Sequence, residues 1–314
     1  MLEDKELNKR PIFTVDSFSS ALDKCSQIRK EDSEGIYVIK ILKSVSSGQF
    51  LFPFSNFCLI GEEASIEGDK YGKQLDEYQE EITTWKTPTL TVTGSNNLFI
   101  GLNIENKAGN PSKKGTSVAL AVYGNENTFK ECQISSTQDT LFLGPLPDDL
   151  STRYLGFLDD KLTHIEGNRR NYFVSSHIKG SVDFIFGAGQ GVFNDCVIES
   201  VEDGRMGVSY VTAPAHSLKD DFGFLFYKCS FISHQIFCQR VYLGRPWRDY
   251  GKCAFISCSY GEHIKEEGVS DWSNSSRRYL TARFSEYPLL KGREDWMKET
   301  SLEFYSDIID KLNK

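Results

Sequence analysis

The feature that most constrains this chain is a short pattern that occurs six times in order along it. Each copy has a phenylalanine, a small or apolar residue three positions later, and an apolar or aromatic residue two positions after that. The copies are Phe99-Leu102-Ile104, Phe129-Cys132-Ile134, Phe173-Ser176-Ile178, Phe193-Cys196-Ile198, Phe226-Cys229-Phe231 and Phe255-Cys258-Tyr260. Strand-rich units of this size predict coils of a parallel β-solenoid, in which each coil buries its face only by stacking on its neighbours. We expect the matching Cys and Leu positions to form a ladder inside the stack.

The pattern predicts one domain over residues 1–314, with the coils between residues 35 and 285. An amphipathic helix is expected over residues 11–30, because apolar residues recur there at helical spacing after Asp16, a plausible N-cap. These residues are Phe18, Ala21, Leu22, Cys25 and Ile28. This helix would cover the first coil.

A second helix is expected over residues 290–314, packed on the outside of the stack. Its apolar residues at helical spacing are Trp296, Leu302, Tyr305, Ile308, Ile309 and Leu312. Between the coils, residues 144–170 interrupt the repeat with Pro, Gly and paired charges. We interpret this segment as a long loop near a functional site, since long ordered loops are often functional.

Composition excludes several classes of function. The formal net charge is −8 and no basic block occurs, so the chain lacks the electrostatic footprint of a nucleic-acid binder. No apolar run is long enough to span a membrane, and the opening MLEDKELNKR is too charged for a signal peptide. The eight cysteines include no CxxC, and the histidines form no HxH or HExxH, so we expect reduced thiols, no metal site and no cofactor.

The repeat register brings two carboxylates together. Asp139 follows Phe129 by ten residues, and Asp183 follows Phe173 by ten, so both occupy the same place in successive coils. Stacked strands are about 4.7–4.9 Å apart, and two acids that close cannot easily both ionise. The same step from Phe193 reaches Asp203. Spacing alone leaves three interpretations open: an acid and nucleophile pair, the carboxylates of a retaining glycosidase, or turn caps and ion ligands.

Motifs around these aspartates resemble a known family. Gln138-Asp139-Thr-Leu, Val-Asp183-Phe-Ile-Phe-Gly and Leu-Gly-Arg245-Pro-Trp247 are similar, in order, to the QDTL, VDFIFG and LGRPW signatures of pectin methylesterases. The resemblance extends from about residue 97 to about residue 272 and is strongest to bacterial members without a signal peptide. It implies a right-handed parallel β-helix and a metal-free esterase acting on galacturonosyl methyl esters.

The resemblance also implies a role for each matching residue. Asp183 would be the nucleophile, Asp139 the general acid and base, and Gln138 a donor to the tetrahedral oxyanion. Arg245 would hold Asp183 ionised by lowering its pKa. Three aromatic residues match cleft positions that bind the C–H faces of sugars, namely Trp247, Phe186 and Phe142.

One position departs from the family pattern. The first oxyanion glutamine of the family stands at the start of a QAVAL-type strand, and here that strand begins with Thr116. Loss of one oxyanion donor typically lowers turnover roughly a hundred- to a thousand-fold. We therefore expect Thr116 to contact substrate and the enzyme to be slow, and we expect Thr116→Gln to raise kcat.

Two alternatives to the esterase follow from the sequence. The first is an inactive or weak sugar-binding β-helix, motivated by Thr116. The second is a β-helix enzyme of different chemistry, either a glycosidase or a thioesterase. The expected partners are methylated pectin or oligogalacturonides, with no nucleic acid, no membrane and a monomeric chain. The expected location is cytoplasmic, or secreted if a leader has been removed, and a cytoplasmic enzyme would act on imported oligomers.

Overall fold

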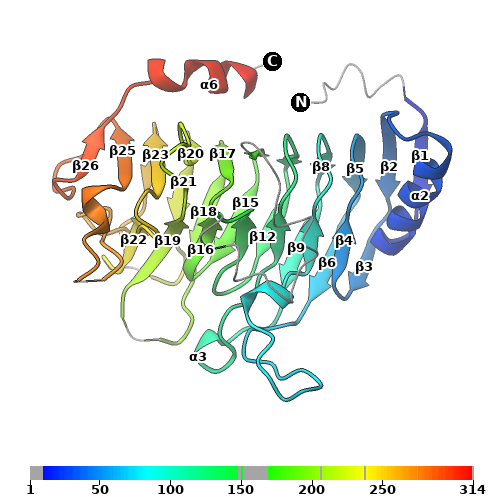
Figure 1. Ribbon diagram of the computed structural model, residues 1–314, viewed down its shortest axis with the longest axis horizontal. Coiled ribbons are helices and arrows are strands. Elements are labelled where there is room, and N and C mark those ends of the chain that lie inside the picture. The colour runs from blue at the N-terminus through cyan, green and yellow to red at the C-terminus, as the bar shows by residue number, and fades with distance from the viewer. Residues whose placement is uncertain are drawn as a thin grey trace.

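The fold is described by a computed structural model for residues 10–147, 150, 169–205, 207–236, 238–273 and 275–312. Within these residues the strands form three sheets, and neighbouring strands of each sheet are parallel. The chain visits the three sheets in turn, so the coils stack along the long axis of the molecule (Figure 1). The predicted all-β fold, a right-handed parallel β-helix, is confirmed.

The three sheets are called A, B and C here. Sheet A contains β1 (Ile12–Val15), β2 (Tyr37–Ile41), β5 (Phe57–Gly61), β8 (Leu98–Ile100), β11 (Thr128–Lys130), β14 (Arg170–Val174), β17 (Gln190–Asn194), β20 (Phe224–Tyr227), β23 (Lys252–Ile256), β25 (Arg283–Tyr287) and β26 (Met297–Glu299). Sheet B contains β3 (Ser44–Ser47), β6 (Ala64–Gly68), β9 (Asn103–Asn106), β12 (Gln133–Ser135), β15 (His177–Gly180), β18 (Val197–Ser200), β21 (Ser230–Ile232) and β24 (Ser259–Tyr260). Sheet C contains β4 (Phe50–Phe52), β7 (Leu90–Val92), β10 (Leu120–Val122), β13 (Leu141–Leu143), β16 (Val182–Gly187), β19 (Ser209–Pro214) and β22 (Val241–Gly244).

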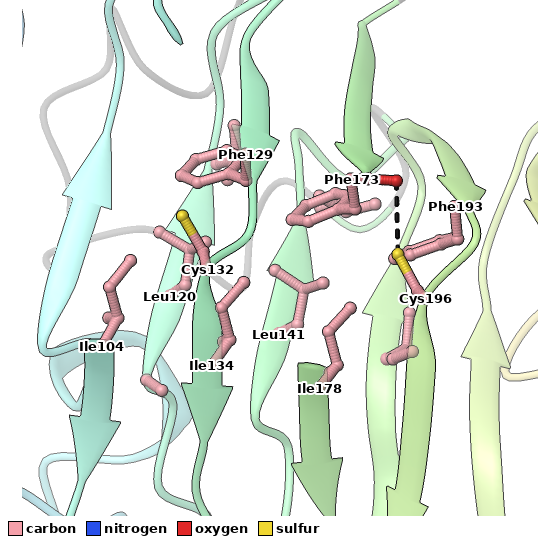
Figure 2. Packing of buried hydrophobic residues seen from close by; sticks show 14 of the residues in the cluster. Ile104, Leu120, Phe129, Cys132, Ile134, Leu141, Phe173, Ile178, Phe193 and Cys196 are labelled. Atoms are coloured by element: carbon pink, nitrogen blue, oxygen red, sulfur yellow. Dashed lines mark hydrogen bonds between the residues drawn. The ribbon is translucent and has the colours of Figure 1, made fainter. Parts of the chain in front are cut away.

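The phenylalanines of the repeat form a continuous stack inside the helix. Phe129 is paired with Phe99 and Phe173 in sheet A, and its ring stacks on theirs with centroids 4.8 and 5.1 Å apart. The stack continues through Phe193 at 4.9 Å (Figure 2). These separations match the strand spacing of a sheet. The repeat therefore places one ring per coil at the same depth, which is the physical basis of the sequence pattern.

The predicted ladder of small residues is also inside the stack. Cys132 and Cys196 are buried beside the rings, and each thiol donates to the carbonyl of the phenylalanine one coil earlier. The Sγ of Cys196 lies 3.3 Å from the carbonyl oxygen of Phe173 (Figure 2). Ser176 takes the same place in its coil and its hydroxyl donates to Phe129. All eight cysteines are free thiols, so these positions are chosen for size and a weak donor.

The N-terminal cap differs from the prediction in its bounds. Helix α2 spans Phe18–Glu31, and Ile12–Val15 form strand β1, which pairs with β2. The N-cap is Ser17, whose side chain accepts from the backbone of Ser20, and not Asp16. Residues 12–15 are rich in β-branched and aromatic side chains, so they extend sheet A instead of joining the helix. The buried face of α2 packs into the main core, as predicted.

The predicted C-terminal helix over residues 290–314 is mostly wrong. Met297–Glu299 form β26, the last strand of sheet A, and helix α6 covers only Ser306–Leu312. Strand pairing outweighs the helical pattern here. Met297 pairs with Phe284, and the Trp296 and Phe284 ring centroids lie 5.4 Å apart. Tyr305 and α6 then pack on the outer face of sheet A, as the position predicted for this helix required.

The remaining elements are short. They are helix α3 (Pro111–Lys114) and the 3-10 turns η1 (Thr84–Lys86), η3 (Arg278–Leu280) and η4 (Glu303–Tyr305). Most of the loop predicted over residues 144–170 lies outside the described residues. Across the described part of the chain, every helix is too short or too polar to cross a membrane.

Candidate active site

The candidate site lies on the outer face of sheet C. Side chains alternate along these strands: Leu141 and Leu143 point into the core, and Phe142 between them points outward. The outward residues form a second apolar cluster beside a cleft of about 500 Å³. The cleft is lined by Thr83, Thr84, Trp85, Gln138, Asp139, Asp183, Phe186, Ala213, Arg245, Trp247 and Trp272. Six of the eight side chains predicted from sequence therefore line the cleft, and Phe142 and Thr116 do not.

The two aspartates occupy equivalent places in adjacent coils. Leu141 of β13 pairs with Ile185 of β16, and each aspartate lies two residues before its member of this pair. The backbone N–H of Asp139 donates to the carbonyl of Val182, the residue before Asp183, at 3.1 Å. The register deduced from the repeat phenylalanines is confirmed, since Phe129 and Phe173 are also paired.

Both aspartates have an unusual backbone conformation. Asp139 has a φ of 65° and Asp183 a φ of 50°, in the left-handed region that Asp tolerates better than most residues. Asp183 also lies in an irregularity of β16, where the register with β19 shifts between Val182 and Ile185. A β-bulge of this kind turns a side chain away from the regular alternation. It brings Asp183 into the cleft beside Asp139.

Arg245 holds Asp183 in a two-point contact. Its Nε donates to Oδ1 at 3.0 Å and its Nη2 to Oδ2 at 2.6 Å. The guanidinium itself lies between two aromatic rings, 3.9 Å from the centroid of Tyr210 and 4.2 Å from that of Trp272. Cation–π contacts on both faces restrict its rotation. The carboxylate of Asp183 is therefore fixed in one plane.

Asp139 is the more strongly perturbed acid. Burial raises its pKa well above the ordinary aspartate value, and the charge of Asp183 raises it further. A hydrogen bond from Gln138 and the charge of Arg245 oppose this rise without cancelling it. A carboxyl group in this environment keeps its proton at a pH where an exposed aspartate is ionised. Asp139 is thus suited to donate a proton.

The pKa of Asp183 reflects two opposing effects. The residue is 7% exposed, and its burial raises the pKa above the ordinary value. The hydrogen bonds and charge of Arg245 lower the pKa, as predicted, but do not outweigh burial. The predicted order of the two pKa values still holds, because the pKa of Asp139 is raised further than that of Asp183. Asp183 therefore ionises first.

The predicted aromatic residues divide into two groups. Trp247 and Phe186 line the cleft, with ring centroids 6.1 Å apart. Phe142 is 1% exposed and is not among the lining residues. The Trp85 ring lies 5.1 Å from it and separates it from the cleft. Phe142 is part of the apolar cluster beneath the lining rings.

Thr116 also lies behind the lining. Its Oγ1 accepts a hydrogen bond from Oγ1 of Thr84 at 3.0 Å. Gly72 packs close on its other side, where an added Cβ would stand 2.5 Å from that oxygen. Thr83, Thr84 and Trp85 line the cleft instead. Thr116, which was predicted to contact substrate, is therefore not among the lining residues, and this neighbouring segment lies there instead.

Sequence reasoning missed two groups of site residues. Trp85 and Trp272 carry only a weak signal, the rarity of tryptophan in a chain that has four. Arg205 was not identified, although it follows Asp203, the third aspartate in register, by two residues. Its Nη1 donates to Oε1 of Gln138 at 2.9 Å. Charge pairs across coils are invisible until the loops between strands are placed.

Among the described residues, no three His, Cys, Asp or Glu side chains are grouped so as to hold a metal ion. The chemistry available to the cleft residues is that of one ionised carboxylate, one protonated carboxyl and two kinds of hydrogen-bond donor. This set can attack an acyl carbon, protonate a leaving group and bind a developing negative charge.

Relatives found by sequence similarity are described as pectinesterases. Pectinesterase QRT1 from Arabidopsis thaliana is 27% identical over 266 residues, which is 81% of this chain and 59% of that protein. Probable pectinesterase 8 from Arabidopsis thaliana is 30% identical over 213 residues, 65% of this chain and 47% of that protein. The chain thus spans less than two thirds of the length of these relatives.

Solved structures share the fold. A pectin methylesterase from carrot superposes with a TM-score of 0.73 at 22% identity, covering 92% of this chain and 88% of that one. A pectin methylesterase in complex with a hexasaccharide gives a TM-score of 0.73 at 20% identity, covering 95% of both chains. The sequence profile of the family described as Pectinesterase matches residues 17–145 and 151–293. With most of its length matched by that profile, this chain belongs to the pectinesterase family.

Proposed function

We propose that the chain hydrolyses methyl esters of galacturonosyl units, releasing methanol and leaving a free carboxylate. The observation that carries this proposal is the asymmetric pair of acids in the cleft. Asp183 is held in two-point contact by Arg245, and Asp139 beside it has the higher pKa. Family membership supplies the reaction class. An acid pair tuned apart in this way suits a nucleophile and a general acid.

In the first half of the reaction, an oxygen of Asp183 attacks the ester carbonyl carbon. The carbonyl oxygen takes the negative charge, and the N–H groups of Gln138 stabilise it. The bond to the methoxy group then breaks as Asp139 gives that oxygen its proton, and methanol leaves. An acyl-enzyme remains, with the galacturonosyl group joined to Asp183 as a mixed anhydride.

In the second half, water takes the place of methanol. Asp139, now ionised, accepts a proton from the water as it attacks the acyl carbon. The bond to Asp183 breaks and its carboxylate is restored beside Arg245. The product is a galacturonic acid group, which gives its proton to solvent and becomes a carboxylate, and the resting enzyme is restored with Asp139 protonated again.

The cleft suits a neutral, methylated sugar. Trp85, Trp247 and Trp272 line it with flat rings, which favour the C–H faces of sugars. The net charge of the chain, −8, disfavours long-range attraction of a polyanion. A related enzyme was solved with a hexasaccharide. We therefore propose methylated pectin segments or oligogalacturonides as substrate; the cytoplasmic location and the monomeric state stay predictions.

The test is to incubate the purified protein with methylated pectin and with short methylated oligogalacturonides, and to assay both methanol and new reducing ends. The esterase predicts methanol from at least one substrate, no new reducing ends, and no methanol from Asp183→Ala. New reducing ends would indicate a glycosidase. Saturable binding without methanol at any pH would indicate a sugar-binding β-helix, and either result would overturn the proposal.

A further inference from the structure

Arg205 connects the catalytic cleft to a second cavity that the proposed reaction leaves without a role. This cavity has a volume of about 340 Å³ and lies next to the cleft, since Arg245 lines both and Tyr210, which packs on Arg245, lines the second. Arg205 reaches from there to the Gln138 side chain at 2.9 Å. None of the motifs around the aspartates includes this residue.

We propose that Arg205 is a positioning residue of the esterase site, which holds the Gln138 carboxamide with its N–H groups facing the reacting acyl group. The inference rests on the proposed function, because it assigns a purpose to the orientation of an oxyanion donor. It concerns a residue that acts through Gln138 and need not touch substrate.

The direction of the amide follows from hydrogen-bond chemistry. A guanidinium has donors and no acceptor, so the Gln138 atom that faces Arg205 has to be the carbonyl oxygen, Oε1. The NH₂ group then faces away from Arg205. One of its protons binds the neighbouring Asp139 carboxyl group, consistent with the hydrogen bond between these side chains. The second N–H is left to the developing oxyanion.

Arg205 is itself held in place by Asp203. Its Nε and Nη2 both donate to Oδ2 of Asp203, at 3.0 and 2.5 Å, and the Asp203 side chain is only 7% exposed. The backbone N–H of Arg205 donates to Oδ1 of the same carboxylate at 3.0 Å. Charge-assisted contacts of this kind restrict a long side chain more than a neutral bond does. The third aspartate in register thus has a different task from the first two.

The charge of Arg205 also acts on the catalytic pair. It lowers the pKa of Asp139 and of Asp183, although less than burial raises them. Among the charged and titratable groups nearby, Arg245 bonds Asp183 and Asp203 bonds Arg205, while Tyr210, Glu202 and Arg240 line the second cavity beside them. Removal of the cation should raise the pKa of both aspartates. Since Asp183 has to be ionised and Asp139 protonated, the activity profile should move to higher pH.

Two substitutions separate orientation from charge. Arg205→Met removes both, so we expect kcat to fall about 10- to 100-fold with KM little changed, and the pH profile to move upward. Arg205→Lys keeps the charge but cannot bond Asp203 and Gln138 with one planar group. We expect it to lower kcat while leaving the pH profile in place. The assay is methanol release across pH, with melting temperature measured for each variant.

Arg240→Met is the matched control. Arg240 lines the same cavity and is equally exposed, 34% for each side chain, but its side chain bonds Glu202 and the backbone carbonyls of Arg205 and Gly207, and among the described residues no hydrogen bond joins it to Gln138. We expect kcat within twofold of the unsubstituted chain. A double variant, Arg205→Met with Gln138→Ala, should be no slower than Gln138→Ala alone when each is assayed at its own optimum pH, because in positioning the oxyanion donor the two residues act as one unit.

Three outcomes decide the matter. No methanol from the unsubstituted chain would overturn the proposed function and this inference with it. Methanol from that chain at rates that Arg205→Met and Arg205→Lys leave unchanged would overturn the inference alone. Additive losses in the double variant would also overturn it, since they would show that Arg205 acts independently of Gln138.

Discussion

The core of sheet A and the cleft on sheet C use the same register to opposite effect. In the core, one phenylalanine per coil stacks on the next, 4.5 Å apart for Phe193 and Phe226. At the cleft, ten residues further along two of these coils, Asp139 stacks on Asp183. Aromatic stacking and burial stabilise the first arrangement. Burial and like charge destabilise the ionised form of the second.

The contrast between the ring stack and the aspartate pair shows how a solenoid can hold a reactive site. Each coil is fixed by its neighbours along all three sheets, so the stack can hold two buried carboxylates side by side on the outer face of sheet C. Such an unfavourable arrangement persists only when the surrounding structure fixes it.

Asp183→Asn should remove activity and spare the fold. We expect kcat for methanol release to fall at least about 10⁴-fold, because the amide cannot form the acyl-enzyme. The melting temperature should not decrease. Asp195→Asn is the matched control: Asp195 has a similar backbone, with a φ of 53°, but is exposed outside the cleft. A slow Asp195→Asn enzyme or an active Asp183→Asn enzyme would contradict the assignment.

Phe173→Ala should do the reverse in the core. Phe173 is fully buried between Phe129 and Phe193, so its truncation should lower the free energy of unfolding by about 3–5 kcal/mol. Urea denaturation measures this loss. The control is Phe304→Ala, since Phe304 is 64% exposed, and its change should stay below about 1 kcal/mol. Equal effects of the two substitutions would show that the ring stack does not carry the stability.

Asp139→Asn should stabilise the protein while it slows the enzyme. The pKa of Asp139 is raised in the folded state, so its ionisation opposes folding at a pH above the ordinary aspartate value. At pH 7 we expect a gain on the order of 1–2 kcal/mol, or about 2–4 °C in melting temperature. Near pH 3 the gain should vanish, since both folded and unfolded chains then carry the proton. A variant less stable than the parent at pH 7 would contradict the raised pKa.

Thr116→Gln should have the smallest effect. A glutamine there could reach past Thr84 and add a donor to the oxyanion, so we expect kcat to rise about two- to tenfold. Thr116→Val is the control, because it removes the hydroxyl that accepts from Thr84 and adds no donor. Initial rates of methanol release measure both variants. An unchanged or lower rate in a folded Thr116→Gln protein would show that another group fills this role.

The sequence predicted the shared place of the two aspartates well because strand pairing propagates register. Once Phe129 and Phe173 are paired, the positions of Asp139 and Asp183 follow with no knowledge of any loop. Phe142 and Thr116 were assigned to the cleft because they match family positions there. The segment Thr83–Trp85 covers both, and it comes from a connection between β6 and β7 whose path no period in the sequence describes.

The helix predicted over the C-terminal residues was mostly wrong for a related reason. Their helical spacing was real, but an unpaired edge of β25 offered Met297 a partner, and strand pairing outweighed local propensity. For Asp183, the sequence identified Arg245 as the partner that lowers its pKa. The burial that outweighs this partner and raises the pKa depends on everything packed around the carboxyl group.

By itself the sequence determined the stack of coils, the rings that fill it and the two carboxylates that share a place in adjacent coils, because periodic residues obey a repeating geometry. Tertiary structure alone decided that burial raises the pKa of both aspartates, which aromatic rings reach the cleft and that Arg205 orients Gln138. Those properties depend on burial and on contacts between loops of different coils. Burial and these contacts do not recur at a regular interval along the chain, so no sequence pattern predicts them.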